Sequence, residues 1–233
     1  PYAWDAVIDT ASDGTKYHIK DPKSYGEATA RGIKAAGEAG KPFCLMVNIS
    51  DPHKPFYSQV KGNKNARDPH VPSRIFTADE VPVPGFLFDD PVVRQELSLY
   101  YSSVRRGDDC LGEVLKALSA SGKEESTVIL FLSDHGMPLP FAKTQLYHHS
   151  THTPLAVRWP GVTKPNTLEK KHMVSAVDLM PTLLDIAGID HPKGFDGRSF
   201  ASILKGEDQN DRQHVIKEYN ENAGASRDPM RAI

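Results

Sequence analysis

The chain has 233 residues, of which 39% are hydrophobic and 25% are charged, and its formal net charge is −2. This composition is typical of a globular protein rather than a disordered one, and the length is enough for one α/β domain. The nearly balanced charge provides no basic field for nucleic acid, and no apolar run reaches the ~18 residues that a membrane-spanning helix needs. We therefore expect neither a nucleic-acid partner nor a membrane span.

The two ends of the chain resemble positions inside a larger domain. The sequence starts PYAWDAVIDT, without an initiator methionine or a signal peptide, and stops at DPMRAI, where a strand is beginning. We expect a fragment that is incomplete at both ends.

The first part of the chain predicts a helix, a strand and a long loop. Residues 24–39 are rich in Ala, Glu and Lys, start at a Ser cap and are followed by Gly40, as expected for a helix. Residues 41–50 (KPFCLMVNIS) form a continuous apolar run, which is typical of a strand buried on both faces. Residues 54–90 contain many prolines and little periodicity, which predicts an irregular excursion beside a binding site.

A long helix is predicted next, over residues 90–121. Asp90 caps it, Pro91 occupies its first turn, and Gly122 ends it. Both cysteines of the chain, Cys44 and Cys110, fall in apolar segments, so we expect buried thiols.

The second half of the chain alternates between strands and helices. Strands are predicted at 126–134, 153–161 and 212–220, and a helix bent at Pro181 is predicted at 175–189. This alternation predicts an α/β fold with a mainly parallel, partly mixed central sheet and helices on both faces. In such sheets, ligands bind beyond the carboxyl ends of the strands.

Chemically active residue types follow two of the predicted strands. Asp51 and His53 come after the first, and Asp134 and His135 come after the second, with Lys143 a little further along. Carboxylate, imidazole and ammonium groups on one rim suit a metal ion and an anionic substrate such as a sulfate or a phosphate. The alternative is that each Asp only shapes a turn by bonding its own backbone.

Several strings resemble the sulfatase family, within the alkaline-phosphatase-like superfamily. SDHGMPLPFAKTQLY and THTPLAVRWPG resemble its metal-and-lysine segment, and DPHKPF resembles its central histidine segment. YYSSVRRGDDCLGEVLKAL and VSAVDLMPTLLDIAGI resemble two of its helices, and all four matches come in family order. The spacing after Asp134 and the closing DPMRAI look most like the heparan N-sulfatase (sulfamidase) branch and its bacterial relatives.

The resemblance implies one alkaline-phosphatase-like catalytic domain, of which residues 1–233 are a part. Sulfatases use a formylglycine, made from Cys or Ser in a C/S-x-P-x-R motif, and a divalent cation, usually Ca²⁺. Neither cysteine nor any serine of this chain lies in such a motif, so the chain contains no nucleophile. We expect the nucleophile segment upstream and a C-terminal subdomain downstream.

The resemblance also assigns roles to residues of this chain. Asp134 and His135 match metal-ligand positions, although Ca²⁺ prefers oxygen donors to an imidazole. Lys143 matches the lysine that bridges the sulfate and the leaving group, and His53 matches the histidine placed to act as general acid. Asp51 is expected to brace the loop that carries His53.

Two further residues are candidates for substrate binding. His149, with His148 and His152, could line a glycan pocket, but three histidines in one loop are more often solvated. Arg231 is a candidate because of its place in DPMRAI. For Asp108 and Asp109, in the long helix, we expect a structural role such as pairing with Arg105 or Arg106.

The sequence therefore predicts a hydrolase that removes sulfate from a sulfated glycan or small sulfated sugar, with N-sulfoglucosamine favoured. Two alternatives remain open: a metal-dependent phosphohydrolase of the same superfamily, and a sulfated-glycan-binding protein without catalytic activity. Family analogy places the protein in the periplasm, the lysosome or outside the cell, and the oligomeric state is not predicted.

Overall fold

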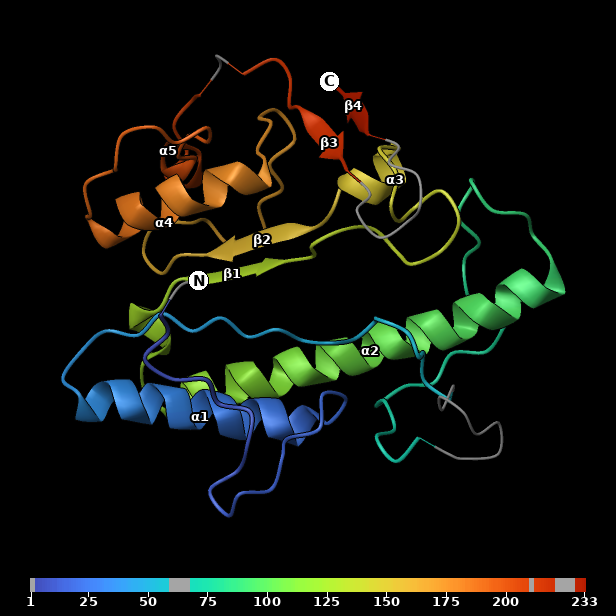
Figure 1. Ribbon diagram of the computed structural model, residues 1–233, viewed down its shortest axis with the longest axis horizontal. Helices are drawn as coiled ribbons and strands as arrows, with labels where there is room; N and C mark the ends of the chain where they lie inside the picture. The colour runs from blue at the N-terminus through green and yellow to red at the C-terminus, as the bar shows by residue number, and fades with distance from the viewer. Residues whose placement is uncertain (1–2, 59–67, 210–211, 221–228) are drawn as a thin grey trace. The chain divides into compact units, whose positions relative to one another are not determined.

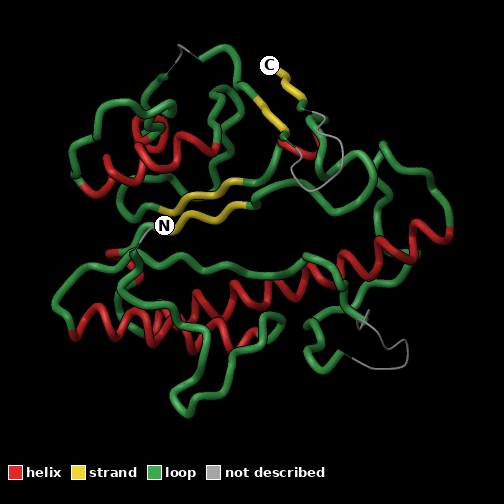
Figure 2. The backbone as a smooth tube through the Cα atoms, in the orientation of Figure 1, coloured by secondary structure: helices red, strands yellow, loops and turns green. Residues whose placement is uncertain are grey.

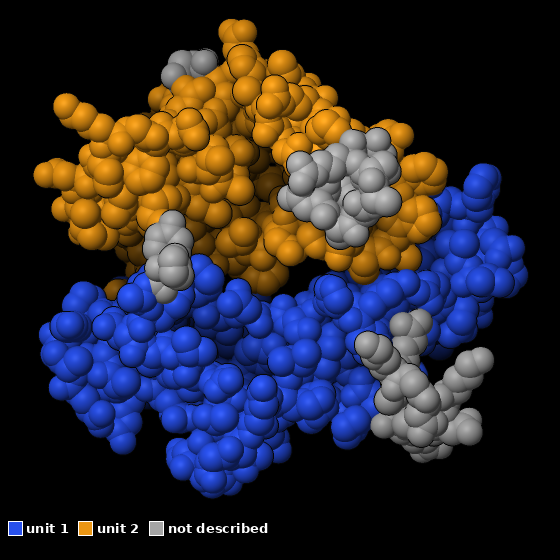
Figure 3. Space-filling view, in the orientation of Figure 1, with its two compact units in different colours: residues 1–125 blue, residues 126–233 orange. Residues whose placement is uncertain are grey.

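The computed structural model describes residues 3–58, 68–209, 212–220 and 229–233. The chain divides into two compact units, residues 1–125 and residues 126–233 (Figure 3). In the described ranges, no helix is long and apolar enough to cross a membrane.

The first unit is built on two helices that lie side by side, α1 (Pro22–Glu38) and α2 (Pro91–Ala120) (Figure 1). The helix predicted at 24–39 is confirmed, but it starts two residues earlier and its cap is Asp21, whose side chain accepts a hydrogen bond from the Lys23 amide. Ser24 instead donates its hydroxyl to the Asp21 carboxylate. Gly40, with φ of +65°, follows the helix, because glycine adopts this left-handed conformation at little cost.

The long helix α2 agrees closely with the prediction. The Asp90 side chain accepts a hydrogen bond from the Val92 amide at 2.8 Å, and Gly122 follows the helix with φ of +69°. The two helices approach closely at Gly26, where a Cβ atom would lie 3.2 Å from the Cβ of Glu113. A small residue at this point therefore allows the helices to pack.

The strand predicted at 41–50 is not found. The segment has no strand assignment (Figure 2). Most of its apolar side chains are exposed, with Met46 67% accessible and Cys44 also exposed. The prediction of a buried Cys44 is therefore wrong, whereas that of a buried Cys110 is confirmed. An apolar run becomes a buried strand only when neighbouring strands bond its backbone on both sides, and the part of the chain that the structure describes does not provide them.

The excursion predicted at 54–90 is confirmed over its described residues, which contain neither helix nor strand. Its apolar anchors Phe56 and Val81 are buried in the core of the unit, as is Leu97 of α2. Two buried serines of α2 bond its backbone: Ser103 accepts from the Tyr57 amide at 2.6 Å, and Ser102 accepts from the Phe76 amide at 3.0 Å.

In its described residues, the second unit contains four short strands in two sheets. β1 (Ile129–Leu132) pairs with β2 (Leu155–Arg158), and β3 (Lys217–Tyr219) pairs with β4 (Met230–Ala232). The predicted strands are confirmed in place, but both described pairs are antiparallel instead of parallel. A parallel pair needs a crossover, usually a long helix, and only the four-residue α3 (His148–Thr151) lies between β1 and β2.

Between β2 and β3, the chain forms helices. A 3₁₀ turn, η2 (Ala176–Asp178), leads into α4 (Leu179–Ala187), and α5 (Ala201–Leu204) follows. The helix predicted at 175–189 is confirmed in place, as η2 followed by α4. Pro181 lies in the first turn of α4, where a missing amide proton costs no hydrogen bond.

Candidate active site

In the first unit, a network of buried ion pairs contacts the segment that carries His53. The Asp51 side chain is fully buried and accepts hydrogen bonds from Lys20 at 2.6 Å and from Arg106 at 2.5 Å. Lys20 also donates to the main-chain carbonyl of His53 at 2.8 Å. The prediction that Asp51 braces this loop is confirmed.

Arg106 is the centre of this network, whereas the sequence suggested it only as a possible partner of Asp108 or Asp109. Its guanidinium is completely buried and bonds the carboxylates of Asp51 and Asp68 and the carbonyl of His70. Burial alone would lower the pKa of Arg106, but its hydrogen bonds to Asp51 and Asp68 raise it overall, so the charge is retained. Its spacing of four residues from the buried Cys110 was the signal that it faces the core.

Arg105 behaves as the sequence predicted. It pairs with Asp108 at 3.1 Å and with Asp109 at 3.3 Å on the outside of α2. These carboxylates have a structural role.

The His53 ring is exposed and oriented by one local hydrogen bond. Its Nδ1 lies 2.7 Å from the carbonyl oxygen of Lys54, and because a carbonyl can only accept, Nδ1 carries the proton. The backbone amide of His53 donates to the carbonyl of Ser50 at 2.9 Å. This leaves Nε2 as the ring atom available to a ligand.

In the second unit, Asp134, His135 and Gly136 form the turn that follows β1. The Gly136 amide donates to the carbonyl of Ser150 at 2.9 Å, which holds the turn against α3. A Cβ atom on Gly136 would lie 1.9 Å from the carbonyl oxygen of His149, so no other residue fits without movement. Glycine is therefore required here for a close approach.

Asp134 and His135 are brought together by this turn. His135 Nδ1 bonds the carbonyl of Gly136 at 2.7 Å, and its Nε2 lies 3.5 Å from Asp134 Oδ2, whose side chain is 85% exposed. Two ligands that bind one cation at ~2.4 Å and subtend roughly a right angle are about this far apart. The carboxylate suits a hard cation such as Ca²⁺, whereas the imidazole suits it poorly.

These two side chains can supply only part of a coordination shell. Among the described residues, no group of three or more His, Cys, Asp or Glu side chains is placed to hold a metal ion. Ca²⁺ takes about six to eight oxygen ligands, so further donors would have to come from elsewhere.

Lys143 is half-buried in a turn with unusual backbone geometry. Phe141 (φ +66°), two residues before it, and Thr144 (φ +58°), directly after it, adopt left-handed conformations, which are costly for large and β-branched residues. No described residue forms an ion pair or side-chain hydrogen bond with the Lys143 ammonium, which leaves this charge available to an anion.

The two candidates for substrate binding lie at the surface. His149 is exposed in α3, where its neighbours His148 and His152 stack with ring centroids 4.5 Å apart. Arg231 lies in β4 directly opposite Glu218 and pairs with it at 2.7 Å, with its side chain 81% exposed. The Arg231 charge is therefore already compensated by a carboxylate.

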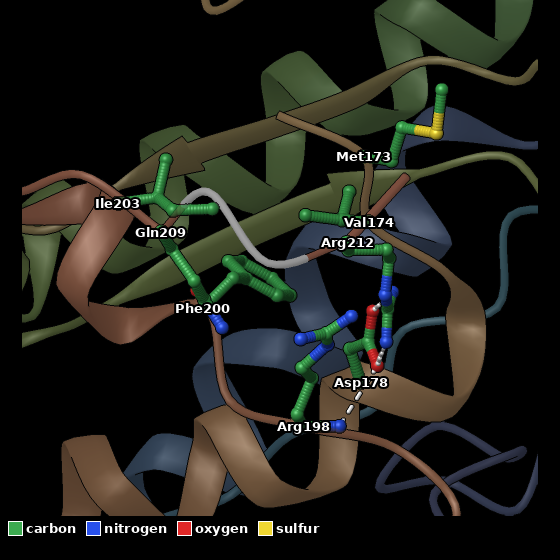
Figure 4. A pocket seen from close by; sticks show the side chains of 8 residues that line it. All are labelled: Met173, Val174, Asp178, Arg198, Phe200, Ile203, Gln209 and Arg212. Atoms are coloured by element: carbon green, nitrogen blue, oxygen red, sulfur yellow. Dashed lines mark hydrogen bonds and ion pairs between the residues drawn. The ribbon is translucent and has the colours of Figure 1, made fainter. Parts of the chain in front are cut away.

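A small pocket in the second unit surrounds a buried carboxylate that the sequence analysis did not identify (Figure 4). Asp178 accepts two hydrogen bonds from the guanidinium of Arg212 and one from the Arg198 amide. None of the residues predicted for the site lines this pocket. The bonds to Asp178 tie η2 to later segments of the chain, which is a structural role.

Comparisons with known proteins agree on one family. A family model described as Sulfatase matches residues 3–189. An ulvan-active sulfatase of Formosa agariphila is 28% identical over 223 residues, covering 92% of this chain and 41% of that protein. The N-sulphoglucosamine sulphohydrolase of Homo sapiens is 33% identical over 163 residues, covering 65% of this chain and 32% of that protein.

Solved structures support the fold. The phosphonate monoester hydrolase of Agrobacterium radiobacter has a TM-score of 0.67 at 22% identity, covering 95% of this chain and 50% of that one. A Bacteroides thetaiotaomicron structure, from work on its metabolism of multiple glycosaminoglycans, has a TM-score of 0.64 at 24% identity and covers 94% and 48%. The expected alkaline-phosphatase-like fold is thus supported. The chain spans less than half the length of the curated relatives named above.

Proposed function

The chain belongs to the sulfatase family, and from this premise we propose that the protein hydrolyses a sulfuric ester or sulfamate bond in a sulfated sugar. The observation that carries the proposal is the family match over residues 3–189. The favoured substrate is an N-sulfoglucosamine of a heparan-type glycan, because the human N-sulphoglucosamine sulphohydrolase shares 33% of its residues with this chain over the aligned region.

The 233 residues form part of one catalytic domain in this proposal. The curated relatives extend well beyond the matched region, and the chain contains no C/S-x-P-x-R string. The formylglycine nucleophile is therefore assigned to a segment before residue 1, and a further subdomain to a segment after residue 233. In the longer protein, neighbouring strands join 41–50 and β1 in a mainly parallel sheet with helices on both faces, which covers the apolar side chains exposed here.

His53 acts as the general acid in the proposed reaction. Its Nδ1 proton is committed to the Lys54 carbonyl, so the protonated ring presents its second proton on Nε2. That proton moves to the leaving oxygen or nitrogen as its bond to sulfur breaks. Lys143, whose ammonium has no partner in the described part of the chain, stabilises the negative charge on the sulfate.

Asp134 binds a divalent cation, with Ca²⁺ favoured because the carboxylate is a hard ligand. A bound cation would neutralise charge on the sulfate oxygens. His135 either completes the pair of donors through Nε2 or bonds the sulfate directly. His149 and Arg231 are proposed to contact the sugar, and for Arg231 this requires release from Glu218.

By family analogy, we also propose that the full-length protein acts in the periplasm, in the lysosome or outside the cell, with a sulfated glycan as its partner.

The test is hydrolysis by the purified full-length protein of three substrates: N-sulfoglucosamine, an O-sulfated sugar and a phosphonate monoester. We expect turnover of a sulfated sugar and much slower turnover of the phosphonate. Faster turnover of the phosphonate would favour the phosphohydrolase alternative, and binding of a sulfated glycan without turnover of any substrate would favour the binding protein. The 233-residue chain alone serves as a control and should show no turnover, because it contains no residue that can become formylglycine.

A further inference from the structure

Lys20 has an unusual position for a lysine in the first unit. The residue is only 6% exposed, and its ammonium lies 2.6 Å from Asp51 Oδ1 and 2.8 Å from the main-chain carbonyl oxygen of His53. A buried ammonium must be paired, because removing it from water is costly. Asp51 provides the pairing charge.

Asp51 does not depend on Lys20 alone. Arg106 bonds both of its carboxylate oxygens, through Nε to Oδ2 at 2.5 Å and through Nη2 to Oδ1 at 3.3 Å. The carboxylate would therefore keep a bidentate partner if Lys20 were absent. Among the residues that the structure describes, Lys20 is the one that donates a hydrogen bond to the carbonyl of His53.

Both ends of that contact are anchored. The Lys20 amide bonds His18 Nδ1 at 3.2 Å in the turn before α1, so the base of its side chain is fixed. On the other side, the His53 amide bonds the Ser50 carbonyl at 2.9 Å, and the His53 ring bonds the Lys54 carbonyl at 2.7 Å. Lys20 thus holds the remaining polar atom of the His53 backbone, and together these bonds determine where Nε2 points.

We propose that Lys20 is a positioning residue, which orients the His53 imidazole for proton transfer through its hydrogen bond to the His53 carbonyl. The inference rests on the proposed function, because it assumes that His53 is the general acid. Lys20 itself is buried beneath the loop and need not contact the substrate. A proton donor must lie within hydrogen-bond reach of its acceptor, so a small displacement of His53 slows only those reactions that need its proton.

The experiment compares two substrates in the full-length protein with Lys20→Met, which keeps an unbranched side chain reaching almost as far and removes the ammonium. One substrate is a sulfated sugar, whose leaving group needs a proton. The other is nitrophenyl sulfate, whose acidic leaving group departs without one. We expect kcat on the sugar to fall by about 10- to 100-fold and kcat on nitrophenyl sulfate to fall by less than about 2-fold, with KM little changed for either substrate.

The ratio of the two kcat values does not depend on how much of the enzyme is folded, since both substrates meet the same preparation. A merely structural role for Lys20 would lower both values together, and that result would overturn the inference. The matched control is Lys34→Met on the exposed side of α1, which should leave both values unchanged. If Lys20→Met does not yield folded protein, Lys20→Gln is the second variant. Its uncharged amide ends one atom short of the lysine ammonium, so the hydrogen bond to the His53 carbonyl is lost and the same change in ratio is expected.

His53→Ala, measured in parallel, separates this inference from the proposed function. A substrate-dependent loss in both His53→Ala and Lys20→Met supports the inference. A substrate-dependent loss in His53→Ala alone overturns the role of Lys20 and leaves the proposed role of His53 intact. If His53→Ala affects both substrates equally, His53 is not the acid, and the inference falls with it.

Discussion

Replacing Gly136 by alanine should destabilise the turn that carries Asp134 and His135. Gly136 is not among the residues with positive φ, so alanine brings no left-handed backbone strain and the cost starts from steric overlap. An added Cβ would lie 1.9 Å from the His149 carbonyl oxygen and 2.6 Å from that of Ala142. Both obstacles are backbone atoms, which cannot rotate away as the end of a side chain can.

The magnitude follows from the movement that the Cβ requires. Cβ contacts below 3.0 Å essentially never occur, so the turn and α3 must separate by roughly 1.1 Å, the difference between 3.0 and 1.9 Å. Overpacking of this kind costs about 1–3 kcal/mol. The separation also breaks the hydrogen bond from the Gly136 amide to Ser150, at about 1 kcal/mol. We expect a loss of about 2–4 kcal/mol in the free energy of unfolding.

The assay is chemical unfolding of the full-length protein, with two other glycines as controls. Gly112 in α2 has no atom within 4 Å of the place that a Cβ would occupy and no positive φ, so Gly112→Ala should stabilise by about 0.5–1 kcal/mol. Gly161 also has open space but a φ of +75°, so Gly161→Ala should cost about 1–2 kcal/mol through its backbone alone. If Gly136→Ala lies within about 0.5 kcal/mol of the wild type, the turn does not pack against α3 in this way.

Three further predictions concern charge. Lys143→Ala should raise KM and lower kcat together in steady-state kinetics, because the ammonium acts on the sulfate in both ground and transition states; a change in KM alone would contradict its role in the transition state. Asp134→Asn should weaken Ca²⁺ binding by the full-length protein in calorimetry, and unchanged affinity would show that Asp134 is not a ligand. Burial raises the pKa of Asp178, but hydrogen bonds from Arg212 and two backbone amides outweigh it, so the folded pKa lies below its usual range. Asp178 therefore adds stability that is complete above pH ~3.9 and is lost as the pH falls through the folded pKa, and Asp178→Asn should flatten this pH dependence in urea unfolding.

The helices were predictable because their signals are local. Asp90, Pro91 and Gly122 each act within one turn of the chain, and the structure confirms all three at the ends of α2. The error in the predicted cap of α1 also concerns neighbouring residues only. Ser24 and Asp21 are both good caps, and the aspartate is the one that accepts the backbone amide.

The sheet was less predictable, because strand pairing depends on residues far apart in the sequence. The run at 41–50 has the composition of a buried strand, yet it lies unpaired with Met46 exposed. Composition shows that a segment can be buried in a sheet, but only its neighbours determine whether and in which direction it pairs. The antiparallel pairing of β1 with β2 could not be read from either strand alone.

The residues of the candidate site also differ in how far the sequence could predict them. Residue type and order made Asp134, His135 and Lys143 candidates for the site, whereas the residues that hold such groups in place could not be predicted in this way. Arg106 and Lys20 lie 55 and 31 residues from Asp51 in sequence, and neither belongs to a short motif. Their role appears only when the fold brings them to the same carboxylate.

The contacts of Asp51 and Gly136 explain why an aspartate and a glycine follow the two strands predicted at 41–50 and 126–134. Asp51 is a structural anion, because two buried cations share its carboxylate and one of them bonds the backbone of His53. Gly136 is glycine because the carbonyl of His149 occupies the space of a side chain. Neither residue needs to touch a substrate, yet each fixes the loop on which a proposed catalytic or metal-binding side chain sits. Substitutions at these supports should therefore change catalysis through geometry, and the ratio of rates on two leaving groups is the measurement that separates that effect from simple loss of folding.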